Sequence, residues 1–236
     1  PPQPRTFFPG VQFPQDADSL DQYWRQIVPN TGPEGGRDFQ QVAGVALMEE
    51  VGPAILMTHS NSGQYGWRVA MHSKNVKAVI SYEPASWSFP ASAPPADIPT
   101  DNPQVAGLST PDLVSDADFD KLTKIPIQII YGDNIEFDNP SPIFGVELWR
   151  VVVQRARQFV DEINKRGGNA ELLFLPDAGL RGNTHFPFSD LNNEKVAKLL
   201  FKYLKRQNLD GYGRGRPGHG HGHGHGHGHD RHAGRW

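Results

Sequence analysis

A serine lies at the centre of a short polar turn between an apolar segment and a helical one. The run Pro53 to Met57 suits a buried strand, and residues 64–71 have helical spacing. Between them stands Thr58-His59-Ser60-Asn61-Ser62, a relaxed form of the G-x-S-x-G nucleophile elbow. Small residues flank the serine by two because the turn brings the strand and helix backbones close together. We therefore predict that Ser60 is exposed as an attacking hydroxyl.

A serine nucleophile needs a base, and histidine is the usual one. Seven of the ten histidines lie in the C-terminal tail, which leaves His59, His72 and His185. His59 is inside the elbow, and His72 lies past the following helix. His185 stands in the loop between an expected strand at 170–175 and the last expected helix. Since the carboxyl ends of parallel strands share one edge of a sheet, we expect His185 at the same edge as Ser60.

Carboxylates that could orient this histidine follow two strands between Ser60 and His185. Glu83 directly follows an expected strand at 76–81, in "VKAVISYEPAS". Asp133 and Glu136 follow an expected strand at 125–131, in "IPIQIIYGDNIEFD". Asp133 abuts Gly132 and could instead fix the turn. Glu83 is the preferred acid, and Asp133 or Glu136 is the alternative.

Strands and helices alternate along the body of the chain, which favours a mostly parallel sheet flanked by helices on both faces. Helices are expected at residues 18–27, 38–50, 146–165 and 193–205. The glycine pair Gly167-Gly168 suits a left-handed cap that ends the longest of them. Residues 18–209 are therefore expected to form one folded α/β domain.

Three segments depart from this alternation. Residues 1–17 contain five prolines and are expected to form an extended N-terminal arm. Residues 85–116, rich in Pro, Ser and Ala, are expected to be a lid-like insertion rather than a core element. Residues 210–236 are expected to be a disordered Gly/His-rich tail. Six of its histidines alternate with other residues, a pattern that predicts chelation of a divalent metal: His219, His221, His223, His225, His227 and His229.

Composition excludes several classes of function. The chain of 236 residues is 37% hydrophobic and 21% charged, with a formal net charge of -3, so no nucleic-acid or anionic-membrane partner is expected. No apolar run is long enough to span a membrane. The absence of cysteine excludes disulfides, thiolate catalysis and Cys-ligated zinc, and leaves the compartment open. No cofactor is expected.

Four segments of the chain together resemble the C-terminal half of an α/β-hydrolase: "ILMTHSNSG", "AVISYEP", "IPIQIIYGDN" and "LRGNTHFPFSDLNN". The likeness covers residues 38–207 and is to serine esterases and lipases whose acid is a Glu after the sixth strand. The order Ser, acid, His is also that of this superfamily. The resemblance implies Ser60 as nucleophile, His185 as base, Glu83 as acid, and the backbone N–H of Asn61 as one oxyanion donor.

The function expected from this resemblance is that of a serine hydrolase. It would cleave small-molecule carboxylic esters by a Ser-His-Glu triad through an acyl-enzyme. The superfamily normally has four strands before the elbow, whereas only 52 residues precede Pro53, and none of them forms a good strand. The N-terminal strands are therefore expected to be missing. An alternative function is that of an inactive or truncated homologue that acts as a binding protein and carries a metal-binding tail.

Overall fold

Four apolar segments form one parallel sheet in the computed structural model of the chain, which describes residues 7–29, 36–135 and 137–211. The central strands are buried almost throughout, as expected for parallel strands covered on both faces. The strands lie in the order β1 (Ala54–His59), β2 (Val76–Tyr82), β5 (Pro126–Tyr131) and β6 (Asn169–Phe174).

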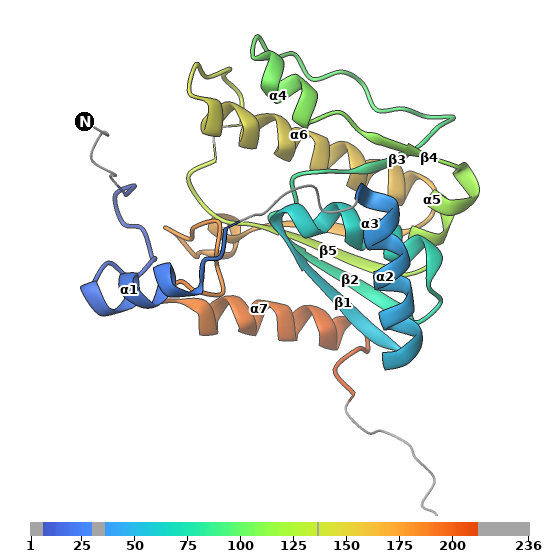
Figure 1. The fold of residues 1–236 in the computed structure, drawn as a ribbon, viewed down its shortest axis with the longest axis horizontal. Helices are drawn as coiled ribbons and strands as arrows, with labels where there is room; N and C mark the ends of the chain where they lie inside the picture. Colours follow the sequence, from blue (N-terminus) through green and yellow to red (C-terminus); the bar gives the residue numbers. More distant parts are fainter. Residues whose placement is uncertain (1–6, 30–35, 136, 212–236) are drawn as a thin grey trace, which may run out of the picture.

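Helices cover both faces of this sheet, with α7 on one side and α2, α3 and α6 on the other (Figure 1). The larger core lies under α3 and α6, where Trp67 and Phe159 are completely buried. A smaller core lies under α7 and includes Ile80, Ile130 and Tyr203. The helices of these layers are α2 (Gly36–Val51), α3 (Gly63–His72), α5 (Asp116–Leu122), α6 (Phe144–Lys165) and α7 (Asn193–Arg206).

The expected elements lie within two residues of the observed ones. Helix α6 ends at Lys165, and Gly167 has a φ of 82°, the left-handed conformation expected of the glycine pair. Ahead of β1, the described part of the chain contains α1 (Ala17–Gln26) and α2 and no strand. None of the helices in the described ranges is long and apolar enough to cross a membrane.

The segment 85–116 contains more structure than the sequence suggested. Strand β3 (Ser88–Pro90) pairs in parallel with β4 (Asp112–Val114), and α4 (Pro103–Leu108) lies between them. Trp87 and Phe89 expose only 2% and 1% of their surface, so this part of the segment belongs to the core. Burial of two large aromatic side chains stabilises it although the surrounding sequence is polar. The expectation that this segment lies outside the core is therefore wrong at Trp87 and Phe89. Its role as a lid stays a prediction.

The expected arm of residues 1–17 is described from residue 7 and continues directly into a helix, so the name N-terminal arm is used below for residues 7–29. This arm lies against the loop that precedes α7. Its helix α1 (Ala17–Gln26) is capped by Asp16, whose carboxylate accepts the N–H of Ser19 at 2.9 Å. Figure 1 shows α1 beside the start of α7, at the end of the molecule opposite the last turn of α7. The Gly/His-rich tail with its six histidines lies outside the described residues, apart from its first two positions.

Candidate active site

The turn between β1 and α3 holds Ser60 in a strained backbone conformation. Residues Ser60–Ser62 form a single 3₁₀ turn, and Ser60 has a φ of 53°. The left-handed region costs a non-glycine residue about 1 to 2 kcal/mol, so the surroundings must enforce it. The hydroxyl of Ser62 donates to the carbonyl of His59 at 2.7 Å and accepts the N–H of His59 at 2.9 Å. These bonds close the turn on itself.

Glycines let α3 start directly against its neighbours. A Cβ at Gly63 would lie 2.6 Å from the Cβ of Pro84, and a Cβ at Gly66 would lie 2.6 Å from the Cγ2 of Thr58. Real Cβ atoms do not approach so closely. The atoms they would meet belong to the short side chains of Pro84 and Thr58, which cannot swing away without moving the backbone. The first turn of the helix is therefore wedged between β1 and the turn after β2, which fixes where Ser60 points.

Three side chains from three loops form a continuous chain of hydrogen bonds at the carboxyl ends of the strands. The Oγ of Ser60 lies 2.8 Å from the Nε2 of His185. The Nδ1 of His185 lies 2.7 Å from the Oε2 of Glu83. With Glu83 ionised, Nδ1 carries a proton and Nε2 accepts one from Ser60. The structure thus brings together all three preferred residues.

The turn after β2 buries the Glu83 carboxylate. Glu83 has a φ of 46°, and its side chain exposes 5% of its surface. Its second oxygen, Oε1, accepts the backbone N–H of Gly132 at 2.6 Å. Burial and the charge of Glu83 raise the pKa of Tyr131, whose hydroxyl donates to the carbonyl of Pro84 at 2.6 Å. The carboxylate is therefore held from both oxygens, one by the imidazole and one by the backbone.

Gly132 is a residue whose role the sequence did not reveal. A Cβ there would meet the carbonyl oxygens of Asn183 and Thr184 at 2.8 and 2.9 Å and the Oε1 of Glu83 at 2.9 Å. Only glycine fits where the ends of two strands and the His185 loop converge. Its place directly after the apolar strand β5, before an acidic residue, is the signal that could have indicated this close approach.

The loop carrying His185 is fixed by a buried carboxylate that the sequence analysis also missed. Asp190 exposes 1% of its surface and accepts hydrogen bonds from the Thr184 N–H, the Thr184 hydroxyl and the Asn183 amide at 2.8 to 2.9 Å. Three donors compensate the buried charge. Since Thr184 and Asn183 directly precede His185, this network fixes the backbone that carries the imidazole. The position of Asp190, three residues before α7, was the available signal.

His59, set aside as the base because it lies inside the elbow, contacts the other histidine. Its Nε2 lies 2.7 Å from the carbonyl oxygen of His185, and the two rings are 4.6 Å apart between centroids. Burial lowers the pKa of His59 below its ordinary value of 6.5. The neutral ring donates its Nε2–H to the His185 carbonyl, so His59 anchors the same backbone from the other side.

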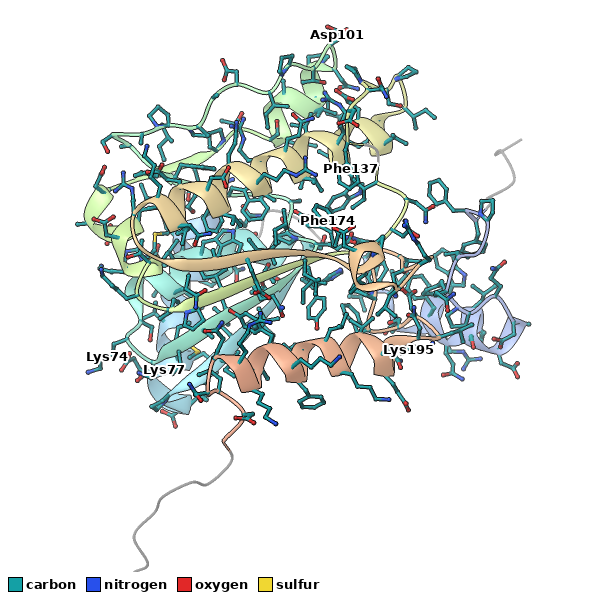
Figure 2. All side chains as sticks on the ribbon, turned by 180° about the vertical axis from the view of Figure 1, so that it is seen from behind. Lys74, Lys77, Asp101, Phe137, Phe174 and Lys195 are labelled. Atoms are coloured by element: carbon teal, nitrogen blue, oxygen red, sulfur yellow. The ribbon has the colours of Figure 1, made fainter. Side chains whose placement is uncertain are left out.

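Asp133, one of the two alternative acids, bonds to backbone N–H groups rather than to the imidazole of His185. The Oδ2 of Asp133 accepts the N–H of Gly182 at 2.8 Å, and its Oδ1 accepts the N–H of Asn134 at 2.8 Å. Asp133 also lines a separate cavity of about 300 Å³. Two residues that line this cavity, Phe137 and Phe174, are labelled in Figure 2, and their ring centroids are 5.1 Å apart. Glu136 lies outside the described residues.

Two predicted features remain, the oxyanion donor Asn61 and a metal site. Asn61 follows Ser60 in the 3₁₀ turn, and its side-chain oxygen accepts from the Gln64 amide. Its role as an oxyanion donor stays a prediction. Within the described ranges, no group of three or more His, Asp or Glu side chains could hold a metal ion. The predicted ligands His219 to His229 lie outside those ranges.

Two apolar cavities flank the hydrogen-bond chain. One of about 320 Å³ is walled by the N-terminal arm and by Thr184, His185 and Phe186. The other, of about 650 Å³, lies between β1 and α7 and includes His59 and Ser62 but neither Ser60 nor His185 in its wall. Only the smaller cavity therefore shares a side chain with the hydrogen-bond chain.

Comparisons with known proteins give two informative likenesses, while no protein-family model matches the chain. A probable secreted lipase, phiG, from Fungal sp. (strain ATCC 74256), is 26% identical over 191 residues, which are 69% of this chain and 48% of the lipase. A solved structure of a novel bacterial esterase is 27% identical, with a TM-score of 0.61, over 84% of this chain and 52% of the esterase chain. The chain spans about half the length of each protein.

These likenesses agree with the architecture described above. The parallel sheet flanked by helices matches the esterase structure over most of the chain, which confirms the predicted fold class. The relatives are a lipase and an esterase, so both likenesses point to the same branch of hydrolases. The chain therefore has the α/β-hydrolase-like fold of the esterases and lipases to which it is similar.

Proposed function

We propose that this protein hydrolyses carboxylic esters with Ser60 as nucleophile, His185 as general base and Glu83 as the orienting acid. The observation that carries the proposal is the chain of hydrogen bonds from Ser60 Oγ to His185 Nε2, at 2.8 Å, and from His185 Nδ1 to Glu83, at 2.7 Å. The strained conformation of Ser60 supports it, because strain of this kind concentrates at functional sites. The names of the lipase and esterase relatives support the choice of ester as substrate.

The first half of the reaction forms the acyl-enzyme. Ser60 Oγ attacks the ester carbonyl carbon while its proton passes to Nε2 of His185. The imidazolium that results is stabilised by the Glu83 carboxylate on Nδ1, and the backbone N–H of Asn61 is the proposed donor to the oxyanion. When the tetrahedral intermediate collapses, the bond from carbon to the alcohol oxygen breaks, and His185 gives its proton to that oxygen.

The second half releases the acid. His185, neutral again, takes a proton from water as the water oxygen attacks the acyl carbon bound to Ser60. The Ser60 oxygen leaves and recovers the proton from His185, which restores the starting state. Throughout both halves the role of Glu83 is to hold the imidazole tautomer through its hydrogen bond to Nδ1.

The proposal is tested with a fluorophosphonate probe, which reacts with activated serines. We expect the parent chain to be labelled and to hydrolyse p-nitrophenyl acetate. The Ser60→Ala variant should lose labelling and at least about 10⁴-fold in kcat/KM. Ser109→Ala, at the end of α4 and far in the chain from the catalytic loops, is the matched control and should be labelled like the parent.

Two results would contradict the proposal. One is labelling and hydrolysis that persist in Ser60→Ala, since another nucleophile would then carry the activity. The other is a parent chain that circular dichroism shows to be folded and that neither reacts with the probe nor cleaves the ester. That second result would support the alternative of a non-catalytic binding protein, which the likeness to a lipase and an esterase does not favour.

A further inference from the structure

The N-terminal arm is attached to the loop that carries His185. The N–H of Gln12 donates to the carbonyl of Gly182 at 2.7 Å, and the carbonyl of Gln12 accepts the N–H of Leu191 at 2.8 Å. At Gly182 a Cβ would lie 2.0 Å from the carbonyl oxygen of Gly10, and its φ is 77°. The arm therefore runs so close to this loop that only glycine fits between them.

Aromatic side chains continue the contact from the arm to the loop. Phe13 exposes 9% of its surface and packs edge to face on Tyr23 of α1, at 5.1 Å between ring centroids. Tyr23 packs edge to face on Phe186, the residue after His185, at 5.8 Å. This ladder of rings holds α1 over the loop. Figure 2 shows α1 beside the start of α7, close to the labelled Lys195.

A cavity of about 320 Å³ remains between the arm and the loop. Five of its wall residues come from the arm, and Thr184, His185 and Phe186 come from the loop. The wall is mainly aromatic, and His185 is its only ionisable side chain apart from the Tyr23 phenol. An uncharged apolar group fits such a wall. An apolar cavity of about 150 Å³ holds benzene, so this cavity has room for one aromatic ring with its linker. The aromatic rings of the wall favour a ring over an aliphatic chain.

The position of His185 assigns this cavity to one part of the substrate. In ester cleavage, the histidine gives its proton to the leaving alcohol oxygen, which must therefore lie within hydrogen-bond reach of Nε2. The acyl carbon, by contrast, is bonded to the serine. The cavity includes His185 in its wall but neither Ser60 nor Asn61. The group nearest to it is thus the one attached to the alcohol oxygen.

We propose that the N-terminal arm builds the alcohol-binding pocket of the enzyme and that this pocket selects esters of small aromatic alcohols. This inference rests on the proposed ester hydrolysis. Leu20 is the residue best placed to test it, since it lines the cavity from α1 and is partly exposed, so that a larger side chain there disturbs no core.

Two isomeric esters separate the alcohol side from the acyl side. Benzyl acetate carries its ring on the alcohol, and methyl phenylacetate carries it on the acyl group; methyl acetate is the reference for both. We expect the parent to prefer benzyl acetate to methyl acetate by about tenfold or more in kcat/KM. Leu20→Trp fills the cavity and should abolish that preference, while the ratio of methyl phenylacetate to methyl acetate changes less than about threefold.

The matched control places the same tryptophan just beyond the cavity. Ile27 follows α1, is 47% exposed and is absent from the cavity wall. Ile27→Trp should keep the parent's preferences. Leu20→Ala enlarges the cavity and should favour alcohols larger than benzyl, which guards against a Leu20→Trp chain that fails to fold. An unchanged benzyl preference in Leu20→Trp, or a loss confined to methyl phenylacetate, overturns the proposal.

A binding measurement distinguishes failure of this inference from failure of the proposed function. In the Ser60→Ala background, benzyl alcohol should give saturation-transfer NMR signals. They should weaken severalfold with Leu20→Trp and stay unchanged with Ile27→Trp. Binding of this kind in a chain that hydrolyses no ester would contradict the proposed function and leave the pocket standing. Hydrolysis by Ser60 with no Leu20-dependent binding or selectivity would contradict the pocket alone.

Discussion

Glu83 and Asp133 stand after adjacent parallel strands, β2 and β5, and both reach the loop that carries His185. The Glu83 side chain is 5% exposed and meets the imidazole, whereas Asp133 is 19% exposed and meets the backbone N–H of Gly182. Arg181 lies 3.8 Å from Asp133 and is itself 75% exposed, so solvent screens that pair. The two carboxylates thus hold the same loop at different points and in different surroundings.

The difference lies in the local backbone rather than in the strand ends. Glu83 takes a φ of 46°, and Gly132 offers it a backbone N–H, so its longer side chain turns inward to the histidine. Asp133 bonds to the N–H of Asn134 and closes its own turn, as aspartate does in many turns. A carboxylate at the correct edge of a sheet is therefore insufficient, and the turn that carries it decides which partner it meets.

The largest effect expected from this comparison comes from Glu83→Gln. The amide oxygen of Gln can accept from His185 Nδ1 or from the Gly132 N–H, but not from both. The amide NH2 group, itself a donor, then faces the other donor. We expect kcat/KM for p-nitrophenyl acetate to fall about 10³- to 10⁴-fold, since the imidazole loses its tautomer and its counter-charge. Labelling by the fluorophosphonate probe should slow in parallel. A loss below tenfold would mean that Glu83 only supports the turn.

A smaller effect is expected from Asp133→Asn, the matched change on the other carboxylate. One of its two backbone hydrogen bonds is lost at a partly exposed site, so the free energy of unfolding should fall by about 1 kcal/mol. The fall in kcat/KM should stay below about tenfold, because no reacting group touches Asp133. Urea denaturation and ester kinetics measure the two quantities. If this variant lost as much activity as Glu83→Gln, the roles of the two carboxylates would have to be exchanged.

The smallest effect is expected from His59→Gln and appears only when the pH is lowered. Burial holds the pKa of His59 below 6.5 in the folded protein, so the unfolded chain binds this proton more readily. The parent should therefore lose stability as the pH falls from about 6.5 to the lowered pKa of His59. Gln keeps a donor for the His185 carbonyl and does not titrate, so the variant lacks this loss.

Thermal melts at pH 7.5 and pH 5 test this prediction. The Tm of the parent should drop more than that of His59→Gln, by about 1 to 3 °C for a chain of this size. Parallel Tm curves for the two proteins would show that His59 does not titrate differently on folding.

Much of the fold could be predicted from local patterns in the sequence. The apolar runs of β2 and β5 and the amphipathic period of α6 indicate their structures because hydrophobic burial acts on each segment in the same way. Segment 85–116 was harder, since β3 and β4 are three residues each and their pairing joins positions 24 residues apart. No local pattern reports a contact of that kind.

The candidate site divides in the same way. Residue type and position after a strand selected Ser60, His185 and Glu83, because three of the ten histidines lie in the body of the chain and few serines or carboxylates directly follow an expected strand. The supporting contacts of Gly132, Asp190 and His59 were missed, because each depends on a hydrogen bond in which one partner is a backbone N–H or carbonyl. A backbone N–H or carbonyl has no signature in the sequence of its partner.

The sequence by itself determined the order along the chain of the four sheet strands and the long helices, the sheet edge at which the polar turns meet, and the residues at that edge able to carry nucleophilic chemistry. Only the tertiary structure decided which carboxylate faces His185, which groups fix that histidine, and that the N-terminal arm closes a cavity against it. The physical reason is the separation along the chain over which each effect acts. Propensity and periodicity act between neighbours in the chain, whereas hydrogen-bond partners and cavity walls are set by how distant segments pack in three dimensions.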